Sequence, residues 1–453
     1  MSEKAAMPKQ KERAMRMDFG RVTGRIKPMH AVNNPPFAGG ANFKNFHYLK
    51  DAGIPYVRLH DTGGVYGGHV FVDIPNLFRN FDADENDPAS YDFAFTDALM
   101  KEICEQGSKP YFRLGVTIEN YHYIKAYNIY PPADFDKWAR ICEHVIAHYN
   151  EGWADGYHMG IEYWEIWNEP DNQPDIADNP MWKAPFSEYV RLYEVAAKHL
   201  KACYPHLKIG GYASCGFYAI FPGEFSNIAA SSRRTDYFIE CLDEFLAHLQ
   251  KNNLPLDYFS WHSYSAVDKN AAYARYIRKK LDDYGFKDAE THLNEWNPGT
   301  QYRGTLTDAA NVAENFLVLQ NEPVDMLMYY SGQTSASTYN GLFESGTARP
   351  YKVFYVFCAF NELYKMGEQV AVNGMPEGVS CVAARDGAGC AFMLVNRGAG
   401  TAISLDLVGT DAKEFEISRS NESESFENTV TVKAAELVSL SVARDEIILV
   451  KSK

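Results

Sequence analysis

The positions of hydrophobic residues divide the chain into two parts. Up to about residue 360, short runs rich in β-branched and aromatic residues alternate with longer segments of helical period. In 134–149, for example, Trp138, Cys142 and Val145 recur at steps of four and three, which predicts a helix with one buried face. Eight strand-like runs, each followed by a helix or a long loop, predict an α/β fold of the (β/α)8 TIM-barrel type. These runs span residues 24–32, 54–60, 109–116, 161–168, 207–212, 256–262, 290–295 and 324–330.

The pattern changes after about residue 366. Short β-type runs follow one another, separated by turn residues, and no helical stretch interrupts them. This pattern predicts a small C-terminal antiparallel β-sandwich. We therefore expect a mobile leader at 1–15, a barrel domain at 16–365 and an accessory sandwich domain at 366–453. Residues 16–20, which include Met17–Phe19, are candidates for an extra strand of the sandwich.

Polar and aromatic residues collect where the predicted strands end. In a barrel of parallel strands all carboxyl ends meet at one face, which is where such folds carry their chemistry. Two strands end in an asparagine followed by a carboxylate, Asn168-Glu169 and Asn294-Glu295, and Pro170 terminates the first of them. The other strand ends supply basic and aromatic side chains: His30, Arg58, His60, His262, Tyr264, Trp296 and Tyr330.

Two carboxylates on a shared rim suit the hydrolysis of glycosidic bonds. One must donate a proton to the leaving oxygen, while the other attacks the anomeric carbon or activates water. Glu169 and Glu295 are the pair that the strand ends favour, and the sequence leaves their separation open. Glu165 has the same parity along its strand as Glu169 but lies deeper, so we expect a buried ion pair with Arg58.

Composition and charge narrow the classes of partner. Lys and Arg number 44 against 59 Asp and Glu, a net charge of −15 that argues against nucleic acid or an anionic membrane as partner. No run of about twenty apolar residues predicts a membrane span. The charged N-terminus lacks the apolar segment of a secretory signal, so we expect a cytoplasmic protein. The eight cysteines lack CxxC spacing and are interpreted as reduced packing residues.

Five motifs together resemble glycoside hydrolase family 39, which belongs to the clan A of retaining (β/α)8 glycosidases. The resemblance covers roughly residues 20–365 and is compatible with a C-terminal sandwich. The Asn-Glu-Pro motif is shared across the clan, whereas the Arg-x-His and Phe-Ser-x-His-x-Tyr elements narrow the resemblance to the family. The motifs are His30–Asn34, Tyr56–Asp61, Trp164–Pro170, Asp257–Tyr264 and Asn294–Trp296.

The resemblance implies a role for each matching residue. It makes Glu169 the general acid/base and Glu295 the nucleophile, so that Glu169 must be protonated near neutral pH and Glu295 ionised. It also places Asn168 on the 2-hydroxyl of the sugar in the −1 subsite. Tyr264 and Arg58 would hold Glu295 ionised and aimed. The remaining members would line the sugar pocket or stack on sugar faces: His30, His60, His262, Trp296 and Tyr330.

Because of two departures from the family pattern, the resemblance does not determine which sugar the protein acts on. The third strand reads Arg113–Val116 where the family xylosidases carry a Glu-Leu-Gly-Phe type, and the eighth ends in Tyr329–Thr334 without a Trp-rich, acidic ending. We predict a retaining exo-glycosidase acting on β-linked oligosaccharides, with β-xylosides as first guess and a pocket closed by loops 63–86 and 168–185. The alternatives are an α-L-arabinofuranosidase, an α-L-iduronidase-like enzyme in which Arg113 meets a carboxylate, and a non-catalytic carbohydrate-binding protein.

The predicted partner is an oligosaccharide or glycoside, and no cofactor is needed. We expect no metal site, because His30, His60 and His262 lack HxxxH or HxH spacing. A homo-oligomer is compatible with the sequence, which determines neither the oligomeric state, the linkage preference nor any transglycosylation.

Overall fold

The computed structural model describes residues 14–37, 43–62, 72–118, 128–221, 232–335 and 337–453. Residues 1–13 of the predicted leader 1–15 and residues 63–71 of the predicted loop 63–86 lie outside these residues, whereas Met15 is described and belongs to a strand. Eight parallel strands close into a barrel in sequential order, which confirms the predicted fold class. The strands are β2 Ala31–Asn33, β3 Tyr56–Leu59, β4 Lys109–Leu114, β5 Tyr163–Ile166, β6 Lys208–Ser214, β7 Tyr258–Ser263, β8 Glu290–Trp296 and β9 Met326–Tyr330.

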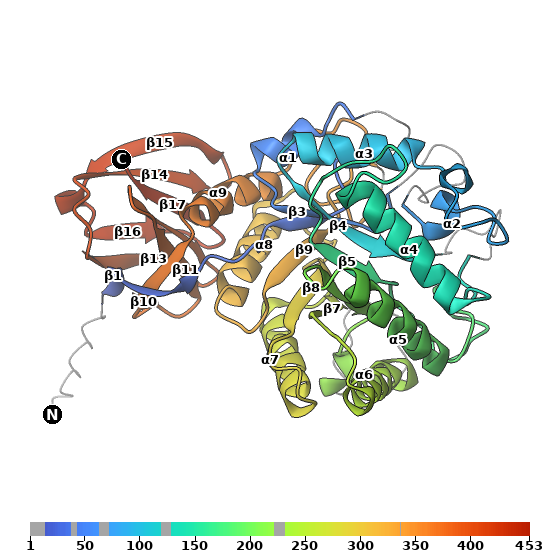
Figure 1. The fold of residues 1–453 in the computed structure, drawn as a ribbon. Coiled ribbons are helices and arrows are strands. Elements are labelled where there is room, and N and C mark those ends of the chain that lie inside the picture. The colour runs from blue at the N-terminus through green and yellow to red at the C-terminus, as the bar shows by residue number, and fades with distance from the viewer. Residues whose placement is uncertain (1–13, 38–42, 63–71, 119–127, 222–231, 336) are drawn as a thin grey trace, which may run out of the picture.

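The helices surround the barrel. Figure 1 shows α3 to α8 arranged around the strands, with α9 beside the C-terminal β-domain. The helices are α1 His47–Asp51, α2 Ile74–Leu77, α3 Ala94–Glu105, α4 Phe135–Asn150, α5 Phe186–Cys203, α6 Ser232–Asn252, α7 Val267–Asp283, α8 Leu306–Leu319 and α9 Lys352–Met366, with 3-10 turns at Pro88–Ser90, Tyr218–Ile220 and Ala434–Glu436.

Helix α4 shows how the sequence produces these elements. Its N-cap residue Asp134 accepts a hydrogen bond from the Lys137 amide at 3.0 Å, which satisfies one of the first free N–H groups of the helix. Trp138, Cys142 and Val145 are buried on one face, as the spacing predicts. This face packs against the barrel.

The predicted position of the first barrel strand is wrong. The prediction placed it at 24–32, but the barrel strand β2 is only Ala31–Asn33. Gly24 and Arg25 belong instead to a long strand, β1 Met15–Arg25, which leaves the barrel altogether. Residues 26–30 connect the two strands.

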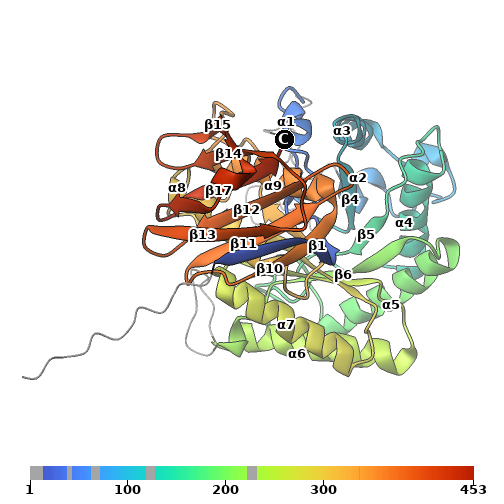
Figure 2. The same ribbon diagram turned by 90° about the vertical axis from the view of Figure 1, so that its left-hand side faces the viewer.

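The C-terminal region forms a nine-stranded sheet in the order β15-β14-β17-β12-β11-β10-β1-β13-β16. Figure 2 shows β1 among the strands of this domain. It pairs antiparallel with β10 and parallel with β13, so the sheet is mixed and not purely antiparallel as predicted. The strands are β10 Glu368–Asn373, which the sequence pattern missed, β11 Val379–Arg385, β12 Cys390–Asn396, β13 Thr401–Val408, β14 Glu414–Ser420, β15 Ser425–Lys433, β16 Ser439–Val442 and β17 Ile447–Ser452.

Alternation along β11 gives this domain two packing faces. Cys381 and Ala383 lie in the core of the β-domain itself, together with Met15, Met17 and Phe19 of β1. The opposite face of β11 joins the barrel core, because successive side chains of a strand point to opposite sides. Polar contacts support the junction: Arg397 forms an ion pair with Glu314 of α8 at 3.4 Å, and Lys451 one with Glu362 of α9 at 2.8 Å.

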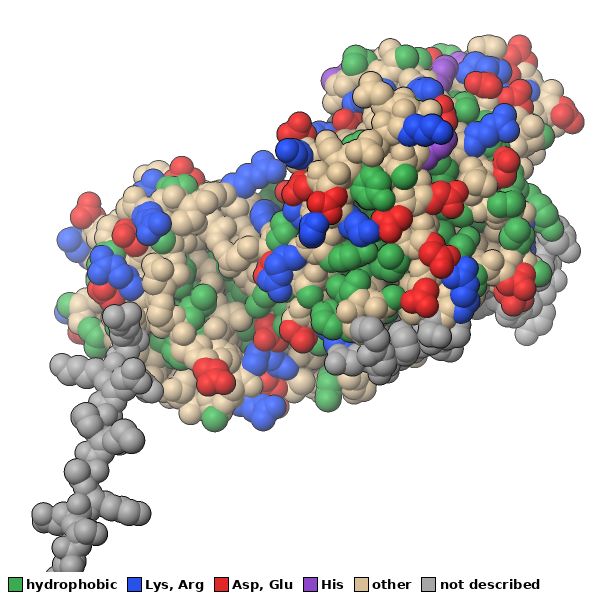
Figure 3. Space-filling view, turned by 90° about the horizontal axis from the view of Figure 1, so that it is seen from below, with side chains coloured by type: hydrophobic (Ala, Val, Ile, Leu, Met, Phe, Trp, Pro, Cys, Tyr) green, Lys and Arg blue, Asp and Glu red, His purple; other side chains and the backbone are tan. Residues whose placement is uncertain are grey.

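The surface carries charges of both signs. On the face seen in Figure 3, the described Lys and Arg side chains are interspersed with Asp and Glu and do not gather into one basic area. Among the described residues, no helix combines the length and apolarity that crossing a membrane requires.

The role of β1 in the sheet leads to a stability prediction. Met17 is fully buried, so we expect Met17→Ala to lower the free energy of unfolding by about 2–5 kcal/mol through the cavity it leaves. Met375, which is 44% exposed, offers a matched control whose change to Ala should stay within about 0.5 kcal/mol. Urea unfolding followed by circular dichroism measures both, and equal losses in the two variants would contradict the buried role of β1.

Candidate active site

A cavity of about 590 Å³ opens at the carboxyl ends of the barrel strands. Six of the residues that the sequence predicts for the site line it, and the rest of its wall comes from the segments that follow β3, β4, β6, β8 and β9 and from α6. Its volume lies within the range of about 300–1,000 Å³ that is typical of small-molecule sites. The six predicted residues are His60, Asn168, Glu169, Tyr264, Glu295 and Tyr330.

Glu169 stands three residues beyond the end of β5 on a constrained turn. Its φ of 45° and the φ of 73° at Trp167 lie in the left-handed region, which costs a non-glycine residue about 1–3 kcal/mol. The Glu169 amide donates to the carbonyl oxygens of Tyr212 and Ala213 at 3.2 and 3.1 Å, so main-chain contacts with β6 hold the turn. Its carboxylate accepts a hydrogen bond from Asn172 Nδ2 at 2.7 Å.

Glu295 lies in β8 and faces the cavity. The Tyr264 hydroxyl donates to its Oε1, and Arg58 Nη1 approaches its Oε2 at 3.5 Å. The predicted contacts of Tyr264 and Arg58 with Glu295 are therefore present. Only 9% of the Glu295 side chain is exposed, against 14% for Glu169, so both carboxylates are largely buried in the cavity wall.

Arg58 lies beneath the cavity floor and is fully buried. Its Nη2 stands 2.7 Å from Glu165 Oε2, which confirms the predicted buried pair. The guanidinium also donates to Asn33 Oδ1 at 3.0 Å and to Asn168 Oδ1 at 2.6 Å. Burial acts to lower the pKa of Arg58, but the charges of Glu165 and Glu295 outweigh this effect and raise the pKa overall. Arg58 is therefore a permanent cation.

His262 connects the two carboxylates. Its Nδ1 lies 2.7 Å from Glu169 Oε1 and its Nε2 lies 3.7 Å from Glu295 Oε2. An oxygen of each carboxylate and a nitrogen of His262 all lie within 4.8 Å of one another. That spacing could also hold a metal ion, but Arg58 beside the group already supplies a positive charge. His262 itself is fully buried below the cavity and does not line it.

The pKa values in this cluster are set by mutual interaction. Burial raises the pKa of Glu295, and the charge of Glu169 adds to that rise against the opposing effects of His262 and Arg58. Burial also acts to raise the pKa of Glu169, but the hydrogen bond and the charge of His262 lower it below its ordinary value. Burial lowers the pKa of His262, yet the two carboxylates raise it overall.

This order of pKa values differs from the expected one. The roles implied by the family resemblance require a protonated Glu169 and an ionised Glu295, whereas the contacts within the site favour an ionised Glu169 beside a protonated His262. The physical reason is the 2.7 Å hydrogen bond, which places the imidazolium charge directly on the Glu169 carboxylate.

The prediction that His30 and Trp296 line the pocket is wrong, because both side chains lie in the protein core. His30 precedes β2 and therefore lies at the amino end of the strand, where its Nε2 contacts the Gly53 carbonyl at 3.1 Å. Burial lowers the pKa of His30 to about 3, so it is a neutral core residue. Trp296 follows the inward-facing Glu295 in β8 and points outward, where it packs on Phe316 and Tyr329.

The structure adds residues that sequence reasoning missed. Arg234 of α6 lines the cavity and donates from Nε to the Asn172 carbonyl at 2.7 Å. Nothing in the sequence marked Arg234, because it lies in a helix and belongs to none of the strand-end motifs. Asp61 accepts a hydrogen bond from the Tyr330 hydroxyl at 2.5 Å. Tyr339 stands near the rings of Tyr264 and Tyr330, at centroid distances of 5.5 and 5.7 Å.

Arg113 does not face the cavity. It is fully buried and forms an ion pair with Asp73 at 2.6 Å, while its Nη2 also donates to the His60 carbonyl at 2.9 Å. Its charge is therefore compensated inside the protein. The structure does not support its predicted use as the partner of a sugar carboxylate.

Comparisons with known proteins identify the family. The family model described as glycosyl hydrolases family 39 matches residues 8–345. Two curated β-xylosidases are similar: one from Geobacillus stearothermophilus, 22% identical over 379 residues, and one from Caldicellulosiruptor saccharolyticus, 24% identical over 364 residues. The matches cover 73% and 71% of this chain and 67% and 64% of those proteins, which is about two thirds of their length.

A solved structure extends the similarity to the whole fold. A glucosidase from Croceicoccus marinus superposes with a TM-score of 0.76 over 97% of this chain and 98% of its own, at 18% identity. The barrel and the β-domain are thus found together in another protein. With the family model covering the barrel and its rim of carboxylates, the chain belongs to glycosyl hydrolases family 39 and is an O-glycosyl hydrolase.

Proposed function

We propose that the protein is a retaining exo-glycosidase that removes terminal sugars from β-linked oligosaccharides, with β-xylosides as the first substrate class. One observation carries the proposal: oxygens of Glu169 and Glu295 lie within 4.8 Å of each other across the cavity. Retaining enzymes hold their two carboxyl groups about 5–5.5 Å apart, whereas inverting enzymes leave about 6.5–9.5 Å for a water molecule. The β-xylosidases among its relatives support the choice of sugar.

In the first step Glu295 attacks the anomeric carbon. The bond to the leaving oxygen breaks while Glu169 transfers its proton to that oxygen, and the sugar becomes covalently bound to Glu295. In the second step a water molecule attacks the same carbon, Glu169 takes up a proton from it, and the bond to Glu295 breaks. Two inversions give net retention of configuration.

The proton for Glu169 is available within the site. Transfer from His262 Nδ1 across the 2.7 Å hydrogen bond gives a protonated Glu169 and a neutral His262. This transfer removes two opposing effects on the pKa of Glu295, the positive charge of His262 that lowers it and the negative charge of Glu169 that raises it. Arg58 and the Tyr264 hydroxyl remain in contact with Glu295 and favour its carboxylate form.

Asn168 is positioned for the 2-hydroxyl of the sugar. Its Oδ1 accepts from Arg58 Nη2 at 2.6 Å, so its amide nitrogen is the group that donates to a ligand. A hydrogen bond at this hydroxyl strengthens as positive charge develops on the sugar ring, and it therefore lowers the barrier.

A second candidate is a glycosidase for an acidic sugar, of the α-L-iduronidase-like kind. The observation in its favour is Arg234, a guanidinium in the cavity wall. Arg113, the residue that the sequence suggested for this purpose, is already paired with Asp73. An α-L-arabinofuranosidase would use the same two carboxylates, so substrate comparison decides among these activities.

The carboxylate roles predict distinct phenotypes. We expect Glu295→Ala to lower kcat by about 10⁴-fold or more, since it removes the nucleophile, and Glu169→Ala to lower it by about 10²- to 10⁴-fold. With an activated aryl glycoside, azide should rescue Glu295→Ala with an inverted glycosyl azide and Glu169→Ala with a retained one. The exposed Glu105→Ala serves as control. Full activity in either pocket variant would refute the assignment, and calorimetric sugar binding without turnover would indicate a binding protein.

The shared proton predicts a bell-shaped dependence of kcat/KM on pH. The acid limb should lie above pH 4.5, because a raised pKa means that Glu295 gains its proton earlier than an ordinary glutamate as pH falls. The alkaline limb should lie above pH 6.5, because a raised pKa lets His262 keep the shared proton to higher pH. Stopped assays with an aryl β-xyloside measure the profile, and an alkaline limb below 6.5 would argue against the sharing.

Arg234→Gln separates the two substrate candidates. If the natural sugar carries a carboxylate, this change should raise KM for an aryl uronide by about 10- to 100-fold, because a charge-assisted hydrogen bond is lost. KM for the matched neutral xyloside should then change little. Wild-type preference for the xyloside, with equal effects of Arg234→Gln on both substrates, supports the β-xylosidase proposal.

A further inference from the structure

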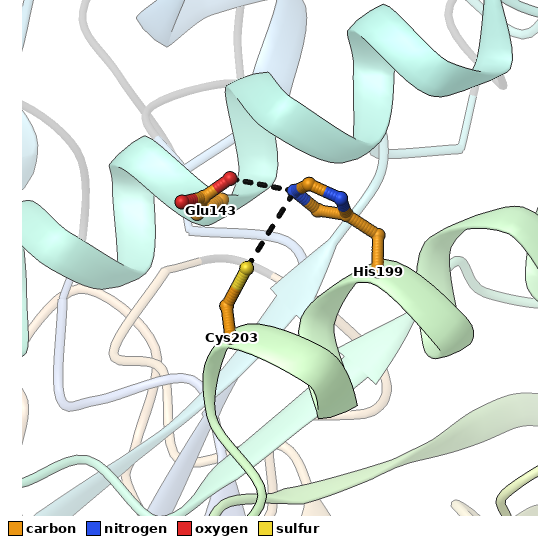
Figure 4. A group of neighbouring side chains, drawn as sticks. All are labelled: Glu143, His199 and Cys203. Carbon is orange, nitrogen blue, oxygen red and sulfur yellow. Dashed lines mark hydrogen bonds and ion pairs between the residues drawn. The ribbon is translucent and has the colours of Figure 1, made fainter.

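A group of metal-binding side chains lies on the outside of the barrel, remote from the cavity. Glu143 of α4 and His199 and Cys203 of α5 direct one ligand atom each toward a common point (Figure 4). His199 Nε2 stands 2.5 Å from Glu143 Oε2 and 3.9 Å from Cys203 Sγ. We propose that these three residues form a zinc-binding site.

The chemistry of the three ligands selects the metal. Thiolate, imidazole and carboxylate are the ligands that Zn²⁺ takes in proteins, whereas Mg²⁺ and Ca²⁺ prefer oxygen alone. His199 and Cys203 are four residues apart and share one face of α5, so the helix itself sets their spacing. Glu143 comes from the neighbouring helix. Three protein ligands leave a fourth position for water.

The distances fit a tetrahedral ion after small side-chain shifts. With metal–ligand distances of about 2.0–2.3 Å, zinc holds nitrogen and oxygen ligands roughly 3.3 Å apart and nitrogen and sulfur ligands roughly 3.6 Å apart. The sulfur of Cys203 must move closer to His199 by a few tenths of an ångström, and Glu143 must move away by less than about 1 Å. The side chains of Glu143 and His199 are about one third exposed, at 30% and 31%, so they have room for these shifts.

The local field favours a cation. Cys203 is the last residue of α5, where the unpaired carbonyl groups of a helix end give a negative potential. The Tyr204 hydroxyl reaches Glu151 Oε2 at 3.5 Å and the Glu143 carbonyl at 3.4 Å, which brings a second carboxylate to the same corner. Among the described ion pairs, Glu143 pairs only with His199.

A second histidine–glutamate pair, with no cysteine of the described residues beside it, offers a comparison for the proposed zinc site. His248 of α6 lies 2.7 Å from Glu194 of α5, in a contact between neighbouring helices like that of His199 and Glu143. Among the residues that the structure describes, no cysteine sulfur lies close enough to complete a group of three ligands with this second pair. Cys203 is also the one exposed cysteine of the eight, whereas the others are buried or half-buried. The pair of His248 and Glu194 is therefore a built-in control.

An occupied site would join the two helices on either side of β5. Helix α4 precedes this strand and α5 follows the loop that carries Glu169. The carboxyl end of α5 lies at the amino end of the barrel strands, opposite the cavity, because helices in this fold run antiparallel to the strands. Zinc here would cross-link two βα units and raise stability without touching a residue of the pocket. The sequence did not predict this site because its ligands come from two helices.

Cobalt titration of freshly reduced protein tests the proposal. Co²⁺ takes zinc ligands and shows a thiolate-to-metal charge-transfer band, so we expect this band at one equivalent and its loss when Zn²⁺ is added. Loss of a residue that only orients a ligand already weakens metal sites by about 10- to 100-fold, so Cys203→Ser and His199→Ala should weaken binding at least about 100-fold. His248→Ala and Cys104→Ser should bind like the wild type.

Thermal unfolding gives a second measurement. Zn²⁺ should raise the Tm of the wild type and of the two control variants, but not of Cys203→Ser, whose exposed position makes it a mild substitution. Circular dichroism verifies that each variant is folded. Cobalt uptake without a thiolate band, as ligation by Glu169, His262 and Glu295 would give, would overturn the proposal. So would a band that persists in Cys203→Ser.

Discussion

The buried guanidinium of Arg58 is the interaction on which the site depends. An uncompensated charge in a protein interior costs several kcal/mol, so a fully buried arginine requires partners in fixed places. Glu165 supplies the opposite charge, and Asn33 and Asn168 accept the remaining hydrogen bonds. These partners come from β2, β5 and the turn after β5, and Glu295 of β8 lies 3.5 Å away. A single cation therefore ties together the strand ends that carry both carboxylates.

Above Arg58, the side chains of Glu169, His262 and Glu295 form a cluster of interacting charges and do not titrate independently. His262 lies between Glu169 and Glu295 and lowers the pKa of both, while the two carboxylates raise the pKa of His262 and Glu169 raises that of Glu295. In such a cluster the titration belongs to the group as a whole. An ionised Glu169 can therefore take up a proton from His262, because a hydrogen bond of 2.7 Å joins the two side chains.

The two ends of the chain meet in the β-domain. Strand β1 inserts between β10 and β13, so the N-terminal residues that precede the barrel complete a sheet built from the C-terminal part of the chain. One face of β11 belongs to the core of this sheet and the other to the core of the barrel. The β-domain is consequently packed against α8 and α9 as a continuation of the catalytic domain's interior.

The sequence by itself determined the alternation of strands and helices, the barrel, the later β-domain and the two carboxylates, because hydrophobic period and strand-terminal motifs are local properties of the chain. It also predicted the pair of Arg58 and Glu165 from strand parity. Only the tertiary structure decided where side chains point and what surrounds them. His30 lies outside the pocket because strand β2 begins only at Ala31, which places His30 at the amino end of the strand. Trp296 lies outside it because successive residues of a strand face opposite sides, so it points away from the side that Glu295 faces. Arg234 and the order of the pKa values depend on contacts between elements distant in sequence, which no local pattern encodes.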